Sequence, residues 1–206
     1  MFLRGIGVLL SALVYCLNPV AAEMAASSGF PEAKGQLVSK NVYQSASSEH
    51  VLLQTESGYY QTRPDPKDPE YVHANKEIYV YDHLLQGKIP GPLNFKLYDY
   101  VHDCIAAARL DFTEQSPLIT DLDGDGHKEV WISYYKGCHG DVSPDELKVF
   151  MYKEGIKHSI RGRTFLFVDG KFYGGDYKFD ASMSRADPRF RTFGEQLFRY
   201  LATERK

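Results

Sequence analysis

Acidic side chains alternate along one short stretch of the chain, residues 121–129, where they could serve as oxygen ligands for a cation. Calcium prefers six to eight oxygen ligands, and a short loop supplies them when acidic residues alternate around a tight turn. Gly126 falls at the sixth position, where the chain must bend sharply. The stretch therefore predicts a calcium site, with an affinity on the order of 0.1–1 mM as in extracellular modules. Its candidate ligands are the side chains of Asp121, Asp123, Asp125 and Glu129 and the main-chain carbonyl of His127.

The segments on either side of this acidic loop are typical of strands. Residues 117–120 and 130–135 are short and rich in β-branched or aromatic side chains. An EF-hand would have helical flanks and a glutamate at the twelfth position, where this chain has Ile132. The D-x-D-x-D-G-x-x-E pattern between strands resembles the calcium loop of FG-GAP and integrin-type propeller blades. Glu129 departs from that family, which usually has aspartate at the ninth position.

Two other interpretations of the acidic loop remain open. Asp-Gly pairs are a strong hairpin signal, so the stretch could be an ordinary turn without an ion. A metal other than calcium is the third possibility. Calcium is favoured because four carboxylates within nine residues repel one another unless a cation lies between them.

Two cysteines lie outside the N-terminal apolar segment, and their side chains are also capable of chemistry. Cys104 and Cys138 would form a disulfide in an oxidising compartment. Two free thiols are an alternative, as is a zinc site with the neighbouring His102 and His139, although the usual ligand spacing is absent. A disulfide would close the part of the chain that contains the acidic loop, and would contribute about 3–4 kcal/mol in the chain-entropy model.

The N-terminus has the pattern of a secretory signal peptide over residues 1–22. Arg4 precedes an apolar run over residues 6–17, and small residues at 20–22 form a cleavage site. A membrane anchor is the alternative, but the apolar run is short for one. We therefore expect an exported protein, periplasmic or extracellular, with no transmembrane segment after cleavage.

Composition limits the partners of the remaining chain. The formal net charge is −3 at pH 7 and no run of lysines and arginines occurs, which argues against nucleic acid and anionic membrane surfaces. Residues 23–35 are small and polar and predict a flexible lead-in. Residues 36–206 then form a single β-rich domain that contains the calcium-loop hairpin.

Short strands separated by tight turns predict a mainly β fold, an antiparallel β-meander or open barrel with a C-terminal amphipathic helix. Ser143 followed by Glu146 predicts one helical turn between strands. Asp187 as N-cap and Pro188 at the first position predict the start of the terminal helix, whose apolar stripe should pack on the sheet. The expected strands are residues 36–42, 50–54, 76–82, 95–111, 147–152, 156–160, 164–168 and 171–173, besides the two beside the acidic loop; residues 106–110 also suit a helix by propensity.

No catalytic motif accompanies these elements. Asp141, Asp145 and Glu146 could form an acid/base pair, although capping and turn formation already explain them. The segment of residues 121–162, above all residues 137–155, resembles small exported bacterial proteins labelled surface polysaccharide biosynthesis proteins. This resemblance implies an envelope setting, and it identifies no catalytic residue in this chain. The 27 tyrosine and phenylalanine side chains suit a core or a sugar-binding face. We expect a non-catalytic module that binds glycan or an envelope protein; the alternatives are an envelope enzyme of polysaccharide metabolism and an inhibitor or assembly factor.

Overall fold

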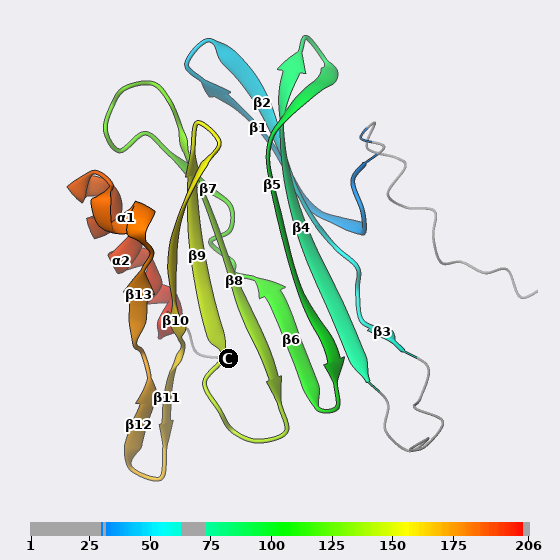
Figure 1. Ribbon diagram of the computed structural model, residues 1–206, viewed down its shortest axis with the longest axis vertical. Helices are drawn as coiled ribbons and strands as arrows, with labels where there is room; N and C mark the ends of the chain where they lie inside the picture. The colour runs from blue at the N-terminus through cyan, green and yellow to red at the C-terminus, as the bar shows by residue number, and fades with distance from the viewer. Residues whose placement is uncertain (1–29, 31, 63–72, 204–206) are drawn as a thin grey trace, which may run out of the picture.

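The computed structural model describes residues 30, 32–62 and 73–203, so the predicted signal peptide at 1–22 and the proline-rich segment at 63–69 lie outside the described residues. Two antiparallel sheets stand side by side, with helices against the outer side of the second sheet (Figure 1). Strands that follow one another in sequence are mostly neighbours in a sheet, which confirms the mainly β meander with a C-terminal helix. The sheets stack as separate layers and do not form a closed barrel within the described residues.

The first sheet has the order β1-β2-β4-β3, and β5 pairs along the other edge of β4, from Ala74 to Gln86. The β2 residues from His50 to Thr55 are all buried, because both faces of this strand are covered. Phe30 and Ala33 pack against its outer face, so the described end of the predicted lead-in is part of the folded domain. The strands are β1 (Gln36–Ser45), β2 (Ser48–Glu56), β3 (Tyr60–Gln61), β4 (Ala74–Gln86) and β5 (Ile89–Cys104).

The second sheet has the order β13-β10-β9-β8-β6, with β7 also paired to β8, and a separate two-stranded hairpin follows β10. Its strands are β6 (Ala107–Phe112), β7 (Leu118–Thr120), β8 (Glu129–His139), β9 (Glu146–Lys153), β10 (Ile156–Arg163) and β13 (Tyr177–Phe179). The hairpin consists of β11 (Phe165–Val168) and β12 (Lys171–Gly174). The predicted helical turn at Ser143 is wrong: this segment has no helix, and β9 begins at Glu146.

Alternation along the strands places one core between the sheets and another beneath the helices. On β9, Phe150 and Tyr152 face the first sheet, whereas Val149 and Met151 face the opposite side. The same alternation on β8 turns Trp131 toward the helices. The core between the sheets contains Leu52, Ile78, Val80, Phe95, Leu97, Val101, Leu110, Val130, Ile132, Tyr134, Phe150 and Tyr152.

The helices α1 (Ala181–Arg185) and α2 (Pro188–Ala202) cover the outer face of the second sheet. Asp187 caps α2 by accepting a hydrogen bond from the Arg189 backbone N–H, as predicted. Gly194 permits close packing, because a Cβ there would lie 3.0 Å from Trp131 and 2.7 Å from Ile160. No helix among the described residues is long and apolar enough to cross a membrane.

The predicted disulfide is present between Cys104 and Cys138, whose Cα atoms are 5.7 Å apart. It joins the end of β5 to β8 and therefore ties the two sheets together. The acidic loop lies at the other end of β8, so the bridge and the loop hold opposite ends of that strand.

Candidate metal site and binding surfaces

The acidic loop connects β7 to β8, which pair with Thr120 opposite Glu129. Gly124 and Gly126 have φ values of 71° and 85°, a left-handed conformation that glycine adopts without strain. The loop also contacts the turn between β1 and β2, where the Ala46 N–H donates to the Gly126 carbonyl at 2.7 Å. The sequence prediction of a strand–loop–strand unit is confirmed.

Lys153, at the end of β9, places its ammonium among the predicted ligands. Its Nζ lies 2.6 Å from Asp123 Oδ2, 2.9 Å from Asp125 Oδ2 and 3.2 Å from Glu129 Oε1. It also donates to the carbonyl of His127 at 3.4 Å. Four of the five predicted oxygen donors thus converge on one cation.

The fifth predicted ligand, Asp121, has a carboxylate oxygen within 4.8 Å of oxygens of Asp123 and Glu129. It pairs with Lys128 at 3.2 Å. The loop therefore brings all five predicted ligands to one place. The His127 imidazole is turned outward, 3.5 Å from Glu154.

Glu129 is fully buried and holds the loop to the sheet. Its second oxygen accepts hydrogen bonds from the Thr120 hydroxyl at 2.8 Å and from the Leu122 N–H at 2.9 Å. The Trp131 indole N–H donates to the same hydroxyl at 2.9 Å, so a third residue fixes the orientation of the pair. A buried carboxylate is stable in this setting because each of its oxygens has a partner.

The electrostatics of the acidic loop are only partly balanced. The hydrogen bond from Lys128 lowers the pKa of Asp121, and that from Lys153 lowers the pKa of Asp125. Burial by itself would lower the pKa of Lys153, but hydrogen bonds to the carboxylates raise it above its usual value. The four carboxylates outnumber the two lysines that pair with them, and Arg189 donates a further hydrogen bond to the Asp123 carbonyl at 3.0 Å.

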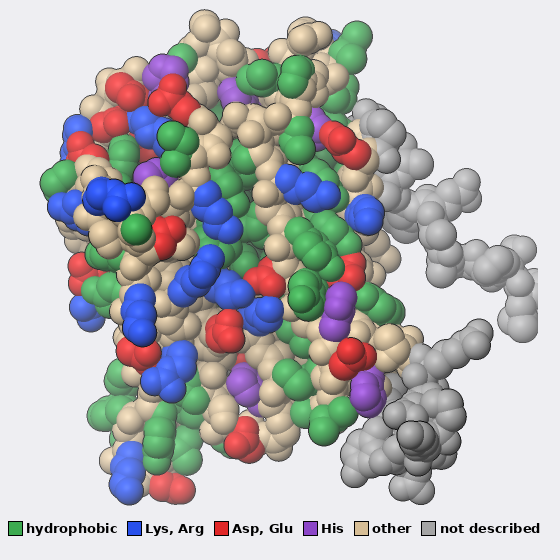
Figure 2. All heavy atoms as spheres, viewed as in Figure 1, with side chains coloured by type: hydrophobic (Ala, Val, Ile, Leu, Met, Phe, Trp, Pro, Cys, Tyr) green, Lys and Arg blue, Asp and Glu red, His purple; other side chains and the backbone are tan. Residues whose placement is uncertain are grey.

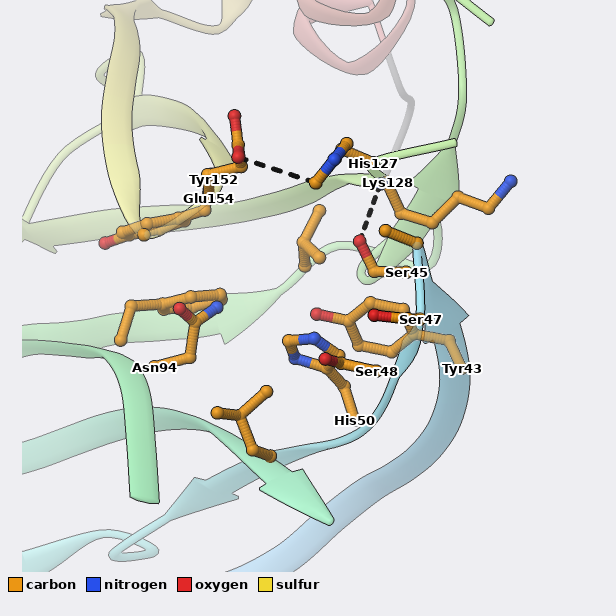
Figure 3. Close-up of a pocket in the computed structure, with 15 residues that line it drawn as sticks. Tyr43, Ser45, Ser47, Ser48, His50, Asn94, His127, Lys128, Tyr152 and Glu154 are labelled. Atoms are coloured by element: carbon orange, nitrogen blue, oxygen red, sulfur yellow. Dashed lines mark hydrogen bonds and ion pairs between the residues drawn. The ribbon is translucent and has the colours of Figure 1, made fainter. Parts of the chain in front are cut away.

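A pocket of about 270 Å³ opens next to the acidic loop, at the end of the sandwich (Figure 3). His127 and Lys128 line one side, and His50 and Asn94 line another. The Lys128 N–H donates to the Ser45 hydroxyl at 2.9 Å across its rim. The pocket is therefore built from both sheets and the acidic loop.

A fully buried aspartate, Asp82 on β4, orients three side chains of this pocket. It accepts hydrogen bonds from Tyr43 at 3.0 Å and Asn94 at 2.7 Å, and its other contact is His50 Nδ1 at 3.1 Å. Burial and the charge of Asp82 raise the pKa of Tyr43, which keeps that hydroxyl a donor. His50 also stacks on Tyr43, with ring centroids 4.9 Å apart.

Aromatic side chains cover the outer face of β4 and β5 around one carboxylate, Glu77. Tyr60 donates to Glu77 Oε1 at 3.0 Å and His102 lies 2.9 Å from the same oxygen, while Tyr79 donates to Oε2. Burial alone would raise the pKa of Glu77, but these hydrogen bonds lower it. We call this surface the tyrosine face and define it as Tyr60, Glu77, Tyr79, Tyr98, Tyr100 and His102.

The rings of the tyrosine face form a continuous row. Tyr79 stacks on Tyr98 at 5.0 Å, Tyr98 lies 5.6 Å from Tyr100, and Tyr100 stacks on His102 at 4.3 Å. Tyr98 and Tyr100 are 46% and 45% exposed, so nearly half of each ring faces solvent. Such a row suits a ligand with flat apolar faces and polar edges.

The acid/base candidates do not form a site. Asp145 is buried and pairs with Arg109 and with His139, whose Nε2 lies 3.2 Å from its carboxylate. Asp141 instead accepts a hydrogen bond from the Ser143 hydroxyl at 2.7 Å. The alternative of a Cys/His zinc site is not supported either. Cys104 and Cys138 are bonded to each other, His102 pairs with Glu77, and no Cys/His cluster occurs among the described residues.

Sequence reasoning missed the residues whose partners are distant in the chain. Lys153, His50, Asp82 and Glu77 each stand alone in the sequence, without a motif. The alternation over residues 76–82 indicated a strand and therefore two faces, but not which face was covered. Comparison of the chain with protein-family models, with curated proteins and with solved structures finds no match.

Proposed function

We propose that this protein is an exported module of the bacterial envelope that binds a glycan without catalysis, and that calcium stabilises its acidic loop. The tyrosine face is the observation that carries the proposal. The envelope setting follows from the signal-peptide pattern and from the resemblance to small exported bacterial proteins. The disulfide between Cys104 and Cys138 is compatible with an oxidising compartment.

The tyrosine face has the chemistry that a sugar ring requires. The exposed rings of Tyr98 and Tyr100 offer apolar surfaces for the C–H face of a sugar, while their hydroxyls offer hydrogen-bond partners at the edge. The rings are held by stacking and by hydrogen bonds to one carboxylate, so little conformational freedom remains to be lost on binding.

Glycan binding is tested by applying the purified protein to an array of bacterial surface polysaccharides. We expect Tyr98→Ala with Tyr100→Ala to weaken binding at least tenfold, because the platform is removed. Tyr200→Ala is the matched control, since this side chain is 60% exposed on α2, outside the tyrosine face. Equal binding by the wild type and the double variant, or no binding to any glycan, would contradict the proposal.

The donor set of the acidic loop fits calcium. Carboxylates of Asp123, Asp125 and Glu129 and one carbonyl already surround a single cation, and Asp121 lies close enough to join them. These are hard oxygen donors of the kind that calcium prefers. Because the ammonium of Lys153 lies at the point of convergence, calcium would have to displace it.

The competition between calcium and Lys153 is tested by thermal unfolding in chelator and in millimolar calcium. We expect calcium to raise the Tm of the wild type by several degrees. The rise should be larger for Lys153→Met, which removes the internal competitor and leaves the carboxylates unbalanced in chelator. Lys88→Met, an exposed lysine on another hairpin, is the control and should respond like the wild type. If the wild type and Lys153→Met are both folded and both indifferent to calcium, the acidic loop does not bind calcium and this part of the proposal is wrong.

An envelope enzyme is the second candidate, and the pair of His50 and Asp82 in the pocket is the observation that favours it. A carboxylate that orients an imidazole is a common acid/base arrangement. Glycoside hydrolysis usually needs two carboxylates, whereas Glu154 is the one carboxylate among the residues that line this pocket. Release of new reducing ends from a bound glycan, abolished in His50→Gln, would favour the enzyme; intact glycan favours binding alone.

A further inference from the structure

Five cations lie on the inner face of the second sheet, and none of the five is buried. Lys136 is on β8, Lys148 on β9, Lys157 and Arg161 on β10, and Lys178 on β13; we call these residues the basic strip. Figure 2 shows lysine and arginine side chains gathered in the middle of this face, with hydrophobic and histidine side chains beside them. This concentration of positive charge contrasts with the net charge of −3 of the whole chain.

The strand register places like charges directly opposite one another. Arg161 pairs with Lys148 on one side and with Lys178 on the other, so three cations form a row across three strands. Like charges opposite each other in an antiparallel pair destabilise a sheet. A local rule that is broken without an evident structural gain is expected where a ligand supplies the compensation.

Acidic partners are too few to neutralise the basic strip. Asp99 lies 2.9 Å from Lys136 and 2.6 Å from Lys148, and Glu146 lies 3.7 Å from Lys148. Among the described residues, no carboxylate lies within 4.0 Å of Lys157 or Arg161. Within 4.0 Å, the five cations therefore have two carboxylate partners, and Asp180 acts on Lys157 from farther away.

Two of the three cations that lack a carboxylate of the described residues within 4.0 Å lie over one aromatic ring. Lys157 Nζ lies 3.8 Å from the centroid of the Phe150 ring, and the Arg161 guanidinium carbon lies 5.6 Å from it. Burial, together with the charges of Arg161 and Lys148, lowers the pKa of Lys157, which indicates repulsion that an anion would relieve. Both side chains reach solvent, so a ligand can approach them.

The basic strip is continuous with the tyrosine face. Lys136 Nζ lies 5.3 Å from the ring centroid of Tyr100, at the edge of the first sheet. Tyr100 in turn belongs to the row of stacked rings on β5. A long ligand that stacks on these rings would therefore cross the edge of β5 and meet the cations.

We propose that the basic strip binds the carboxylates of an acidic polysaccharide, a polymer that contains uronic acid units. This inference rests on the proposed glycan-binding function and names its ligand class. The five cations are distributed over the four adjacent strands β8, β9, β10 and β13, which together span about 14 Å. This spread suits a polymer with repeated charges better than one small anion. The uronate carboxylates pair with the cations that lack an acidic partner, and the sugar faces stack on the tyrosine face.

The test compares two forms of one polymer, polygalacturonate and its methyl ester, which differ in charge but share a backbone. Binding to the purified protein is measured by calorimetry in chelator, because polygalacturonate itself binds calcium. We expect binding to polygalacturonate, at least tenfold weaker binding to the ester, and weakening of the first as sodium chloride is raised. Lys157→Ala with Arg161→Ala should reduce affinity at least tenfold, whereas Lys88→Ala with Arg185→Ala, which removes the same charge elsewhere, should not.

A second variant tests the charge argument in the opposite direction. Asp99→Asn removes the acid that competes for Lys136 and Lys148, and affinity for polygalacturonate should rise severalfold. Thermal unfolding of each variant shows that it is folded. Equal binding of the ester and the acid, unaffected by Lys157→Ala with Arg161→Ala, would overturn this inference and leave the proposed glycan-binding function standing. Absence of any glycan binding would overturn both proposals. If single-stranded DNA binds as tightly as polygalacturonate, the site recognises polyanions in general and the inference of an acidic polysaccharide is overturned.

Discussion

The acidic loop and the basic strip are two charged regions of the same sheet, and both involve β9. At one end of this strand, Lys153 inserts its ammonium among the carboxylates of the loop. Farther back along the strand, Lys148 faces Arg161, another cation, across the register. Cations therefore neutralise part of the negative charge of the loop, whereas the positive charge of the basic strip has fewer acidic partners.

The contrast indicates what each region is for. A fully buried carboxylate such as Glu129 requires partners in the folded protein, because desolvation of an unpaired charge costs several kcal/mol. Cations that reach solvent, such as Lys157 and Arg161, remain hydrated in the free protein and are available to bind a ligand. We infer that the acidic loop is primarily a structural unit and the basic strip a recognition surface.

Glu129→Ala is the strongest test of the structural role of the acidic loop. We expect the free energy of unfolding to fall by about 3–5 kcal/mol, because the substitution leaves Lys153 without its buried partner and removes the hydrogen bonds to Thr120 and Leu122. Chemical denaturation measures the change. Glu195→Ala, which removes a surface pair with Arg199, should cost less than about 1 kcal/mol. Equal costs for the two substitutions would remove the structural role assigned to the loop.

Asp99→Asn should have an intermediate effect and lower the free energy of unfolding by about 1.5–3 kcal/mol at pH 7. It replaces a carboxylate that pairs with two lysines and accepts a hydrogen bond from the Tyr134 hydroxyl. Burial by itself would raise the pKa of Asp99, but these hydrogen bonds hold it well below its usual value. Its stabilising contribution is therefore present above about pH 4 and is lost as the pH falls through the lowered pKa. Denaturation from pH 7 to pH 2 should show the difference between wild type and variant narrowing below pH 4; a constant difference would contradict the assignment.

Lys157→Ala should have the smallest effect: we expect the free energy of unfolding to rise by no more than about 0.5 kcal/mol. The substitution removes a cation that Arg161 and Lys148 repel and that has no carboxylate within 4.0 Å among the described residues. The same denaturation series measures it, with Lys88→Ala as the control for loss of an exposed lysine. A loss of more than about 1 kcal/mol would mean that the stem of Lys157 over Phe150 is structural packing, and the contrast with the loop would weaken.

The prediction at Ser143 failed for a reason that the structure makes clear. The local pattern from Ser143 to Glu146 suits a helical turn, but the backbone of Asp145 is already engaged with Thr164, which accepts from the Asp145 N–H at 2.9 Å. Glu146 in turn pairs with Lys136 across β8 and β9. Hydrogen bonds to strands distant in sequence therefore outweighed a capping signal whose contribution is about 1 kcal/mol.

Several features were determined by the sequence alone, because they depend on residues close together in the chain. The strand–loop–strand unit of residues 121–129, the hairpin at residues 169–170 and the N-cap of α2 at Asp187 all follow from local backbone preferences. The disulfide followed from there being two cysteines outside the apolar N-terminal segment.

Only the tertiary structure decided which side chains meet. Lys153 reaches Glu129 across a strand pair, His50 meets Asp82 from a neighbouring strand, and Arg161 comes to face Lys148. Each meeting depends on strand register, and a shift of one residue would turn the side chain to the other face of the sheet. The sequence contains the charges and the rings, but the pairing of the strands decided that Lys153 lies among the carboxylates of the loop and that Arg161 lies opposite another cation.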